Sequence, residues 1–269
     1  MDNTMDLSLI ATQTALSAGA LLRRGFGAAM EIQTKEGKHN LVTEWDKKSE
    51  ALIIETIKKR FPTHTFLAEE GGTIGTNTEE IQWIIDPLDG TVNFAHNIPV
   101  FAVSIAATLR GEVLAGAVYS PMLQELFVAE KGKGAFLNGK ELRVTDTPSI
   151  EEAILGTGFP YHVSENPLHA LEHFHAFAKM GTPLRRMGCA SIDLSYVAAG
   201  RFDAFWEVSL EPWDYAASKL IIEEAGGTFT DLAGNPFTAL QEGPVLATNG
   251  KLLEEMIQKL QQTMDDASH

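Results

Sequence analysis

The sequence contains a single cysteine, Cys189, among its 269 residues. One thiol cannot form an intrachain disulfide, and it leaves a cysteine-rich zinc site without ligands. No run of about 18 apolar residues is present, so we expect no membrane-spanning segment. The first turns of the chain also lack a charged start followed by an unbroken apolar stretch, so we expect no targeting signal. These absences together predict a cytoplasmic protein.

Positive charge is scarce. The chain has 21 Lys and Arg against 36 Asp and Glu, which gives a formal net charge of −15. An excess of negative charge repels a phosphate backbone, so no nucleic-acid partner is expected. The surplus of carboxylates is compatible with divalent cations. Hydrophobic residues make up 44% and charged residues 21%, which excludes disordered and fibrous architectures and provides for a large core.

The order of elements changes half-way along the chain. In the first half the apolar spacing predicts helices at about 6–24 and 43–60, strands at 65–68 and 81–85, and a β meander over 100–144 with turns at 110–111 and 138–139. In the second half strands are predicted near 153–157, 183–186, 202–207 and 245–248, and helices near 166–179, 191–199, 213–225 and 252–264. Because no linker separates the halves, we expect one unit, residues 1–269, with sub-layers of about 1–149 and 150–269 and a site between them.

The most informative stretch follows the predicted strand at 81–85. Asp86 is placed at the strand end, Pro87 predicts a turn, and Asp89 comes three residues later. Two carboxylates held so close repel each other unless a cation lies between them, and oxygen ligands alone favour Mg²⁺ over zinc. Gly90 and Thr91 then open a short segment whose backbone amides could hold an anion. An Asx turn followed by a helix cap would explain the same residues, and the spacing alone leaves both interpretations open.

Other acidic residues have the same two explanations. Glu69 and Glu70 end the strand at 65–68, and only one of them is expected to face Asp86, because adjacent residues of an extended chain point to opposite sides. Asp214 is a candidate metal ligand or a first-turn acid favoured by the helix dipole. Asp46 follows Thr43 at the spacing of a capping box, and a cap alone would explain it.

Several segments combine these residues with their neighbours. They are Asn40-Leu41-Val42-Thr43-Glu44-Trp45-Asp46, Glu69-Glu70, Asp86-Pro87-Leu88-Asp89-Gly90-Thr91 with its continuation to Pro99, Trp213-Asp214-Tyr215-Ala216-Ala217 and Glu224-Ala225-Gly226-Gly227. Together, over nearly the whole chain, they resemble the inositol monophosphatase family of Mg²⁺-dependent, Li⁺-sensitive phosphatases. The resemblance implies an α+β or α/β fold, a layered α-β-α-β-α sandwich of the sugar-phosphatase type, and a homodimer.

The resemblance also implies roles for individual residues. Two or three Mg²⁺ ions would be bound by Glu69, Asp86, Asp89, Asp214 and the Leu88 carbonyl. The catalytic residues would be Thr91, Asp46 and Glu69, which orient the attacking water. The substrate would contact Leu88, Asp89, Gly90, Thr91, Gly188, Cys189, Ala190, Glu207 and Asp214. Cys189 stands where the family commonly has Ser or Thr, so one hydroxyl contact to the substrate is expected to be missing.

The implied reaction is hydrolysis of a phosphorylated polyol or sugar, first of all myo-inositol monophosphate. Fructose 1,6-bisphosphate, histidinol phosphate and 3′-phosphoadenosine 5′-phosphate are alternatives on the same metal core. Arg185 and Arg186 could bind a second anionic group or form surface ion pairs. Two further readings compete: a zinc hydrolase built on His169-x-x-Glu172-His173, in a helix whose polarity predicts a solvated face, and a silent sugar-phosphate sensor or interaction module.

Overall fold

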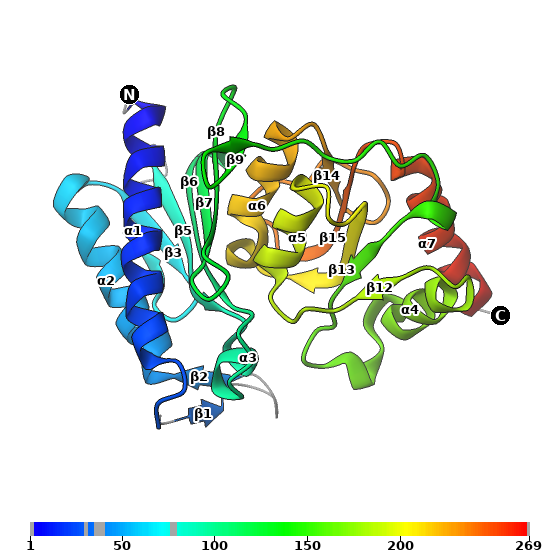
Figure 1. Ribbon diagram of the computed structural model, residues 1–269, viewed down its shortest axis with the longest axis horizontal. Helices are drawn as coiled ribbons and strands as arrows, with labels where there is room; N and C mark the ends of the chain where they lie inside the picture. Colours follow the sequence, from blue (N-terminus) through cyan, green and yellow to red (C-terminus); the bar gives the residue numbers. More distant parts are fainter. Residues whose placement is uncertain (1–2, 30–31, 35–40, 76–79, 268–269) are drawn as a thin grey trace.

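The computed structural model describes residues 3–29, 32–34, 41–75 and 80–267. Five layers follow one another across the molecule, helices alternating with sheets (Figure 1). The helices are α1 (Thr4–Gly25) and α2 (Glu44–Arg60) outside the first sheet, α5 (Ala190–Ala198) and α6 (Pro212–Glu224) between the sheets, and α4 (Ala170–Lys179) and α7 (Leu253–Ala267) outside the second. The expected α-β-α-β-α sandwich is confirmed. Asn40, quoted above, lies outside the described residues.

The first sheet has eight strands in the order β10-β9-β8-β7-β6-β5-β3-β4. Their bounds are β3 Thr65–Ala68, β4 Gly72–Ile74, β5 Gln82–Asp89, β6 Ala102–Leu109, β7 Glu112–Ser120, β8 Glu125–Glu130, β9 Ala135–Leu137 and β10 Lys140–Glu141. From β5 to β10 each strand pairs antiparallel with the next, as the predicted meander requires, whereas β3 and β5 run parallel. The turn pairs Arg110-Gly111 and Asn138-Gly139 both have positive φ, which suits tight hairpins.

The second sheet has five strands in the order β12-β11-β13-β15-β14. Their bounds are β11 Leu155–Thr157, β12 Leu184–Arg185, β13 Ala204–Leu210, β14 Thr228–Thr230 and β15 Gly243–Thr248. A separate pair is formed by β1 (Ile32–Thr34) and β2 (Leu41–Thr43), and the short helices are α3 (Thr91–Ala95), η1 (Ile150–Glu152), η2 (Val163–Glu165) and η3 (Pro167–His169). Strands β11 and β13 run parallel, so the sheet is mixed.

Helix α1 is long and apolar enough to cross a membrane by length and composition alone. Its apolar residues nevertheless recur at helical spacing on one face, and Leu7, Ala15 and Leu22 are fully buried. They lie in one hydrophobic cluster with Ile53 of α2 and Trp83 of β5. The apolar face of α1 therefore covers the first sheet in the manner of a core helix.

Three expectations about local structure are wrong. Strand β5 does not end before a turn at Pro87 but continues to Asp89 through an irregularity in its pairing. The helix expected at 166–179 begins only at Ala170, because Asn166, Leu168 and His169 have positive φ and break the preceding segment into short turns. The solvated face expected for this helix is also wrong at one position, since His173 is fully buried. Strands β1, β2, β4 and β14 were not expected; each has only three residues, too few for a pattern.

Candidate metal centre and active site

A bulge in β5 places two carboxylates on the same site. Asp86 pairs with Ser104 and Asp89 with Ala102, so β5 uses one residue more than β6 over this interval. Pro87 lies inside the bulge, where its missing N–H costs no ladder hydrogen bond. The Leu88 N–H donates to Asp86 Oδ1 at 3.0 Å. The Asx-type hydrogen bond considered above is therefore present, and it coexists with the acidic pair.

Asp86 lies in the electrostatic field of three other carboxylates. Burial raises its pKa well above the ordinary value, and the charges of Glu69, Asp89 and Asp214 raise it further. Burial also raises the pKa of Asp214, followed by the effect of Asp89. The four carboxylates that the sequence selected are thus brought together, although they come from β5, the end of β3 and the start of α6. Their mutual repulsion is what a bound cation would relieve.

Asp89 is held from the opposite layer of the sandwich. Its Oδ2 accepts from the backbone N–H and the hydroxyl of Ser191, at 2.7 and 2.6 Å, and from the Cys189 thiol at 3.1 Å. Burial raises the pKa of Asp89, while these hydrogen bonds and one from the backbone of Ala190 lower it. Cys189 is buried and its thiol faces this carboxylate. Burial raises the pKa of the Cys189 thiol well above the usual range.

Asp46 and Thr91 form a buried pair beside the acidic residues. The Thr91 hydroxyl lies 2.9 Å from Asp46 Oδ1 and also 2.9 Å from the Leu88 carbonyl oxygen. Asp46 Oδ2 accepts from the N–H and hydroxyl of Thr43, which completes the capping box at the start of α2. The capping explanation for Asp46 is confirmed, and its other oxygen, Oδ1, accepts from the Thr91 hydroxyl.

Two adjacent acids at the end of β3 serve different neighbours. The charge of Glu69 acts on Asp86, whereas the charge of Glu70 acts on Asp46 and raises its pKa in addition to the larger effect of burial. This division agrees with the alternation of an extended chain. Asp214 also closes a capping box at the start of α6, since its Oδ2 accepts from the N–H of Glu211 at 2.8 Å.

Gly90 and Gly188 allow the backbone to pass close to the site. Gly90 has φ +88, and a Cβ there would come within 3.0 Å of the Val100 carbonyl oxygen. Gly188 has φ +78, and its carbonyl oxygen accepts from the Asn93 side-chain amide at 3.2 Å. The same amide also donates to the carbonyl oxygens of Val100 and Met187. The short helix expected after Gly90 is present as α3. Asn93 therefore ties the two glycine loops together across the layers.

Glu207 on β13 faces the other side of this region. Burial raises its pKa to about 8, while the charge of Arg186 opposes the shift. A Cβ on Gly158 would stand only 2.0 Å from Glu207 Oε2, so the loop after β11 packs directly on this carboxylate. The upward shift favours the protonated form of Glu207, which can donate one hydrogen bond as well as accept others.

Sequence reasoning missed three residues of this region. Ser191 and Gly158 touch Asp89 and Glu207 from far along the chain, and no local motif signals either contact. The side chain of Tyr161 is 54% exposed, yet the pKa of its phenol is raised. Burial of the rest of the side chain is the largest cause, and the charges of Glu69, Asp214 and the other two carboxylates follow. The loop after Gly158 therefore carries a phenol into the field of the acidic cluster.

The residues fit a hard cation by the chemistry of their donors. Carboxylates and a backbone carbonyl are the oxygen ligands that Mg²⁺ prefers. Within 3–29, 32–34, 41–75 and 80–267, no three His, Cys, Asp or Glu side chains are already placed to hold one ion. Asp86, Asp89 and Asp214 instead each engage one oxygen in a hydrogen bond with a backbone N–H. Each of these hydrogen bonds occupies one oxygen of the carboxylate and does not involve the other.

The histidine motif does not form a comparable centre. The His173 Nδ1 is hydrogen-bonded to Thr263 of α7, and burial lowers its pKa to about 4. Glu172 instead accepts from Asn166 at 2.6 Å.

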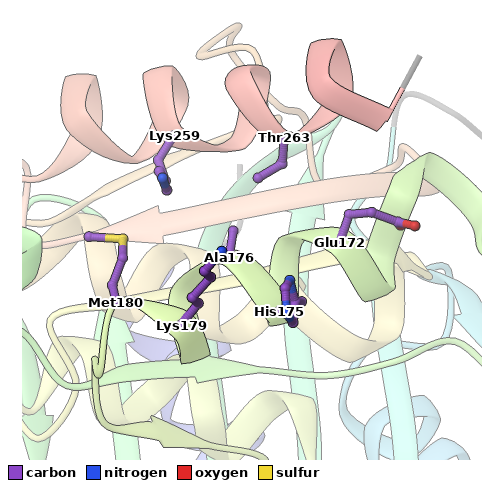
Figure 2. Close-up of a pocket in the computed structure, with 7 residues that line it drawn as sticks. All are labelled: Glu172, His175, Ala176, Lys179, Met180, Lys259 and Thr263. Carbon is purple, nitrogen blue, oxygen red and sulfur yellow. The ribbon is translucent and has the colours of Figure 1, made fainter. Parts of the chain in front are cut away.

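A groove of about 480 Å³ lies between α4 and α7 (Figure 2). It is lined by Glu172, His175, Ala176, Lys179, Met180, Lys259 and Thr263. None of these belongs to the acidic cluster.

The five layers and the acidic cluster on a bulged strand define a layered sandwich of the sugar-phosphatase type. Residues 5–265 match the model of the inositol monophosphatase family, and the chain belongs to that family. It is 38% identical over 262 residues to Nus factor SuhB of Escherichia coli K12, covering 96% of this chain and 97% of the relative. It is 42% identical over 255 residues to inositol-1-monophosphatase of Rhizobium meliloti 1021, covering 93% and 95%.

Similarity to solved structures agrees with this family membership. The inositol monophosphatase of Anabaena (Nostoc) sp. PCC 7120 superposes with a TM-score of 0.88 at 38% identity, covering 97% of each chain. The family consists of phosphatases that act on small phosphorylated substrates and are generally Mg²⁺-dependent. The expected membership is therefore confirmed at the level of the family.

Proposed function

We propose that residues 1–269 form one catalytic unit that hydrolyses myo-inositol monophosphate to myo-inositol and phosphate, with two or three Mg²⁺ ions. The observation that carries the proposal is the buried Thr91–Asp46 pair beside four mutually repelling carboxylates. The metal would be held by Glu69, Asp86, Asp89, Asp214 and the Leu88 carbonyl. When bound, Mg²⁺ acidifies water and offsets the negative charge of the phosphoryl group.

Thr91 and Asp46 are suited to orient the attacking water. The Thr91 hydroxyl has one proton, which it can donate to Asp46 Oδ1, and its lone pairs are then free to accept a hydrogen bond from water. The Leu88 carbonyl competes for the same proton at the same distance. A role for that carbonyl as a metal ligand would direct the Thr91 proton to Asp46. Glu69 supports the water from the cluster side.

Gly90 and the start of α3 supply backbone N–H groups for the phosphate. Gly188, Cys189, Ala190 and Glu207 line the place for the polyol. A buried glutamic acid with a pKa of about 8 can both donate to and accept from ring hydroxyls, which suits a neutral polyol. The similarity to the R. meliloti inositol-1-monophosphatase supports the same substrate.

Arg186 keeps a bisphosphate substrate open. Its charge acts on Glu207 and Asp193, and its side chain lies 3.4 Å from where a Gly188 Cβ would stand. A guanidinium at that position could bind a second phosphate. Fructose 1,6-bisphosphate, histidinol phosphate and 3′-phosphoadenosine 5′-phosphate therefore belong in the same assay.

A second candidate function is favoured by one comparison. The 38% identity to a protein named Nus factor SuhB supports an interaction role, with or without catalysis. A silent interaction module would bind metal and substrate poorly or release no phosphate. We further propose a cytoplasmic homodimer without a nucleic-acid or membrane partner of its own, which size-exclusion chromatography with light scattering and cell fractionation would test.

The proposal is tested by phosphate release from inositol 1-phosphate and the three alternative substrates, each with Mg²⁺ and with Li⁺ added. We expect release to be fastest on the inositol ester and to be suppressed by Li⁺. Faster release from another substrate would change the substrate but keep the reaction. No release from any of them by a folded protein would favour the interaction role.

A further inference from the structure

Ser191 makes two hydrogen bonds to Asp89, a candidate metal ligand, and the proposed function gives Ser191 no role. Its backbone N–H and its hydroxyl both donate to Asp89 Oδ2, at 2.7 and 2.6 Å. The Cys189 thiol adds a third donor to the same oxygen at 3.1 Å. The three donors come from the N-cap residue and the first turn of α5, whereas Asp89 lies on β5 in another layer. The backbone of Ala190 also donates to this carboxylate, and Oδ1 receives none of the three donors from Cys189 and Ser191.

Ser191 is itself held in place by two buried serines. Its carbonyl oxygen accepts from the Ser195 hydroxyl at 2.6 Å and from the Ser218 hydroxyl at 3.0 Å. Ser195 lies one turn further along α5, and Ser218 belongs to α6, whose first turn carries Asp214. All three serines are fully buried. Helices α5 and α6, which face the acidic cluster, are thus joined at Ser191, the residue that is hydrogen-bonded to Asp89.

Asp89 takes the place of the cap that α5 lacks. The N-cap residue Cys189 makes no side-chain cap hydrogen bond. A carboxylate at a helix N-terminus is stabilised by the unpaired N–H groups and by the helix dipole. The N–H and the hydroxyl of Ser191 therefore both donate to the carboxylate oxygen that caps α5.

We propose that Ser191 is a positioning residue: it binds Oδ2 of Asp89 to the start of α5 and so leaves Oδ1 as the oxygen offered to a metal ion. The inference rests on the metal centre of the proposed function. It adds that the affinity for the ion depends on a hydroxyl that is not among the proposed substrate contacts. Hydrogen bonds to a ligand from outside the coordination sphere restrict its orientation, and their loss weakens metal binding.

A purely structural role for Ser191 makes a different prediction. If the hydroxyl only stabilises α5, its removal lowers the melting temperature and leaves metal affinity unchanged in the folded protein. Ser120 provides a matched control, because it is equally buried and its hydroxyl has no hydrogen-bond partner among the described residues. Ser120→Ala therefore removes the same atom from another part of the core.

The test is calorimetric titration of the full-length protein with Mn²⁺, without substrate. We expect Ser191→Ala to weaken binding by roughly ten-fold, while Ser191→Thr, which retains the hydroxyl, stays within about two-fold of the wild type. Ser120→Ala should bind as the wild type does. Ser191→Cys, close to serine in size but a weaker donor, gives an intermediate loss and keeps the test valid if the alanine variant does not fold.

Wild-type affinity in Ser191→Ala, or in Ser191→Cys where only that variant folds, would overturn the inference. Equal weakening in Ser120→Ala would also overturn it. Phosphate release by the wild type is a separate readout. Ser191-dependent Mn²⁺ binding without any phosphate release would refute the proposed function and leave the role of Ser191 standing.

Discussion

Replacing Thr91 with valine separates the chemical step from binding. Valine has nearly the shape of threonine, and Thr91 is buried, so the variant removes a hydroxyl with little change in packing. That hydroxyl is 2.9 Å from Asp46 Oδ1 and is the group proposed to accept a hydrogen bond from the attacking water. Loss of general-base assistance lowers a rate by roughly 10²–10⁴-fold. This corresponds to about 3–5 kcal/mol of activation free energy.

The structure also limits what else should change. Asp46 keeps both hydrogen bonds from Thr43, so the capping box of α2 survives. One buried carboxylate oxygen loses its donor, which costs about 1–3 kcal/mol of unfolding free energy. Steady-state phosphate release should therefore show a large fall in kcat with KM within about three-fold of the wild type. Thr91→Ser, which retains the hydroxyl, should keep most of the rate. A valine variant with kcat within three-fold of the wild type would refute the relay.

Three other predictions concern the acidic cluster and the polyol pocket. Asp89→Asn should abolish Mg²⁺-dependent phosphate release while circular dichroism stays native; full activity would contradict its assignment as a ligand. Burial raises the folded-state pKa values of Asp86 and Asp214 above the unfolded value near 4, so these groups bind protons preferentially in the folded protein. The unfolding free energy measured with EDTA should therefore fall as pH rises above about 4. Added Mg²⁺ should raise the melting temperature more at pH 8 than at pH 5. An unfolding free energy that rises with pH over this range, or an Mg²⁺ effect that does not change with pH, would argue against the acidic cluster. Gly158→Ala places a Cβ 2.0 Å from Glu207 Oε2 and should displace that carboxylate, with a loss of roughly 10–100-fold in kcat/KM; unchanged kinetics on inositol 1-phosphate would exclude Glu207 from the polyol pocket.

Local signals in the sequence predicted much of the candidate site. The spacing of Asp86 and Asp89 and the capping pattern at Thr43 and Asp46 each allowed two explanations. The structure confirms the local turn and the cap, and one oxygen of Asp86 and one of Asp46 take no part in them. A carboxylate has two oxygens, so one can close a cap or a turn while the other faces the site. This explains why such motifs look ambiguous when they are read as a choice.

Some contacts between distant segments could not be predicted. The grip of Ser191 on Asp89 spans 102 positions and depends on how α5 is placed against β5. The fit of Gly158 against Glu207 depends on the pairing of β11 with β13. Backbone conformation was equally hidden at Leu168, whose positive φ no apolar pattern signals.

The central claim is that phosphate release depends on a divalent ion held at the acidic cluster, and metal removal tests it most directly. Wild-type protein should release phosphate from inositol 1-phosphate with Mg²⁺, stop when EDTA is added in excess, and recover when Mg²⁺ is restored above the chelator. Release that continues unchanged in EDTA would contradict the account.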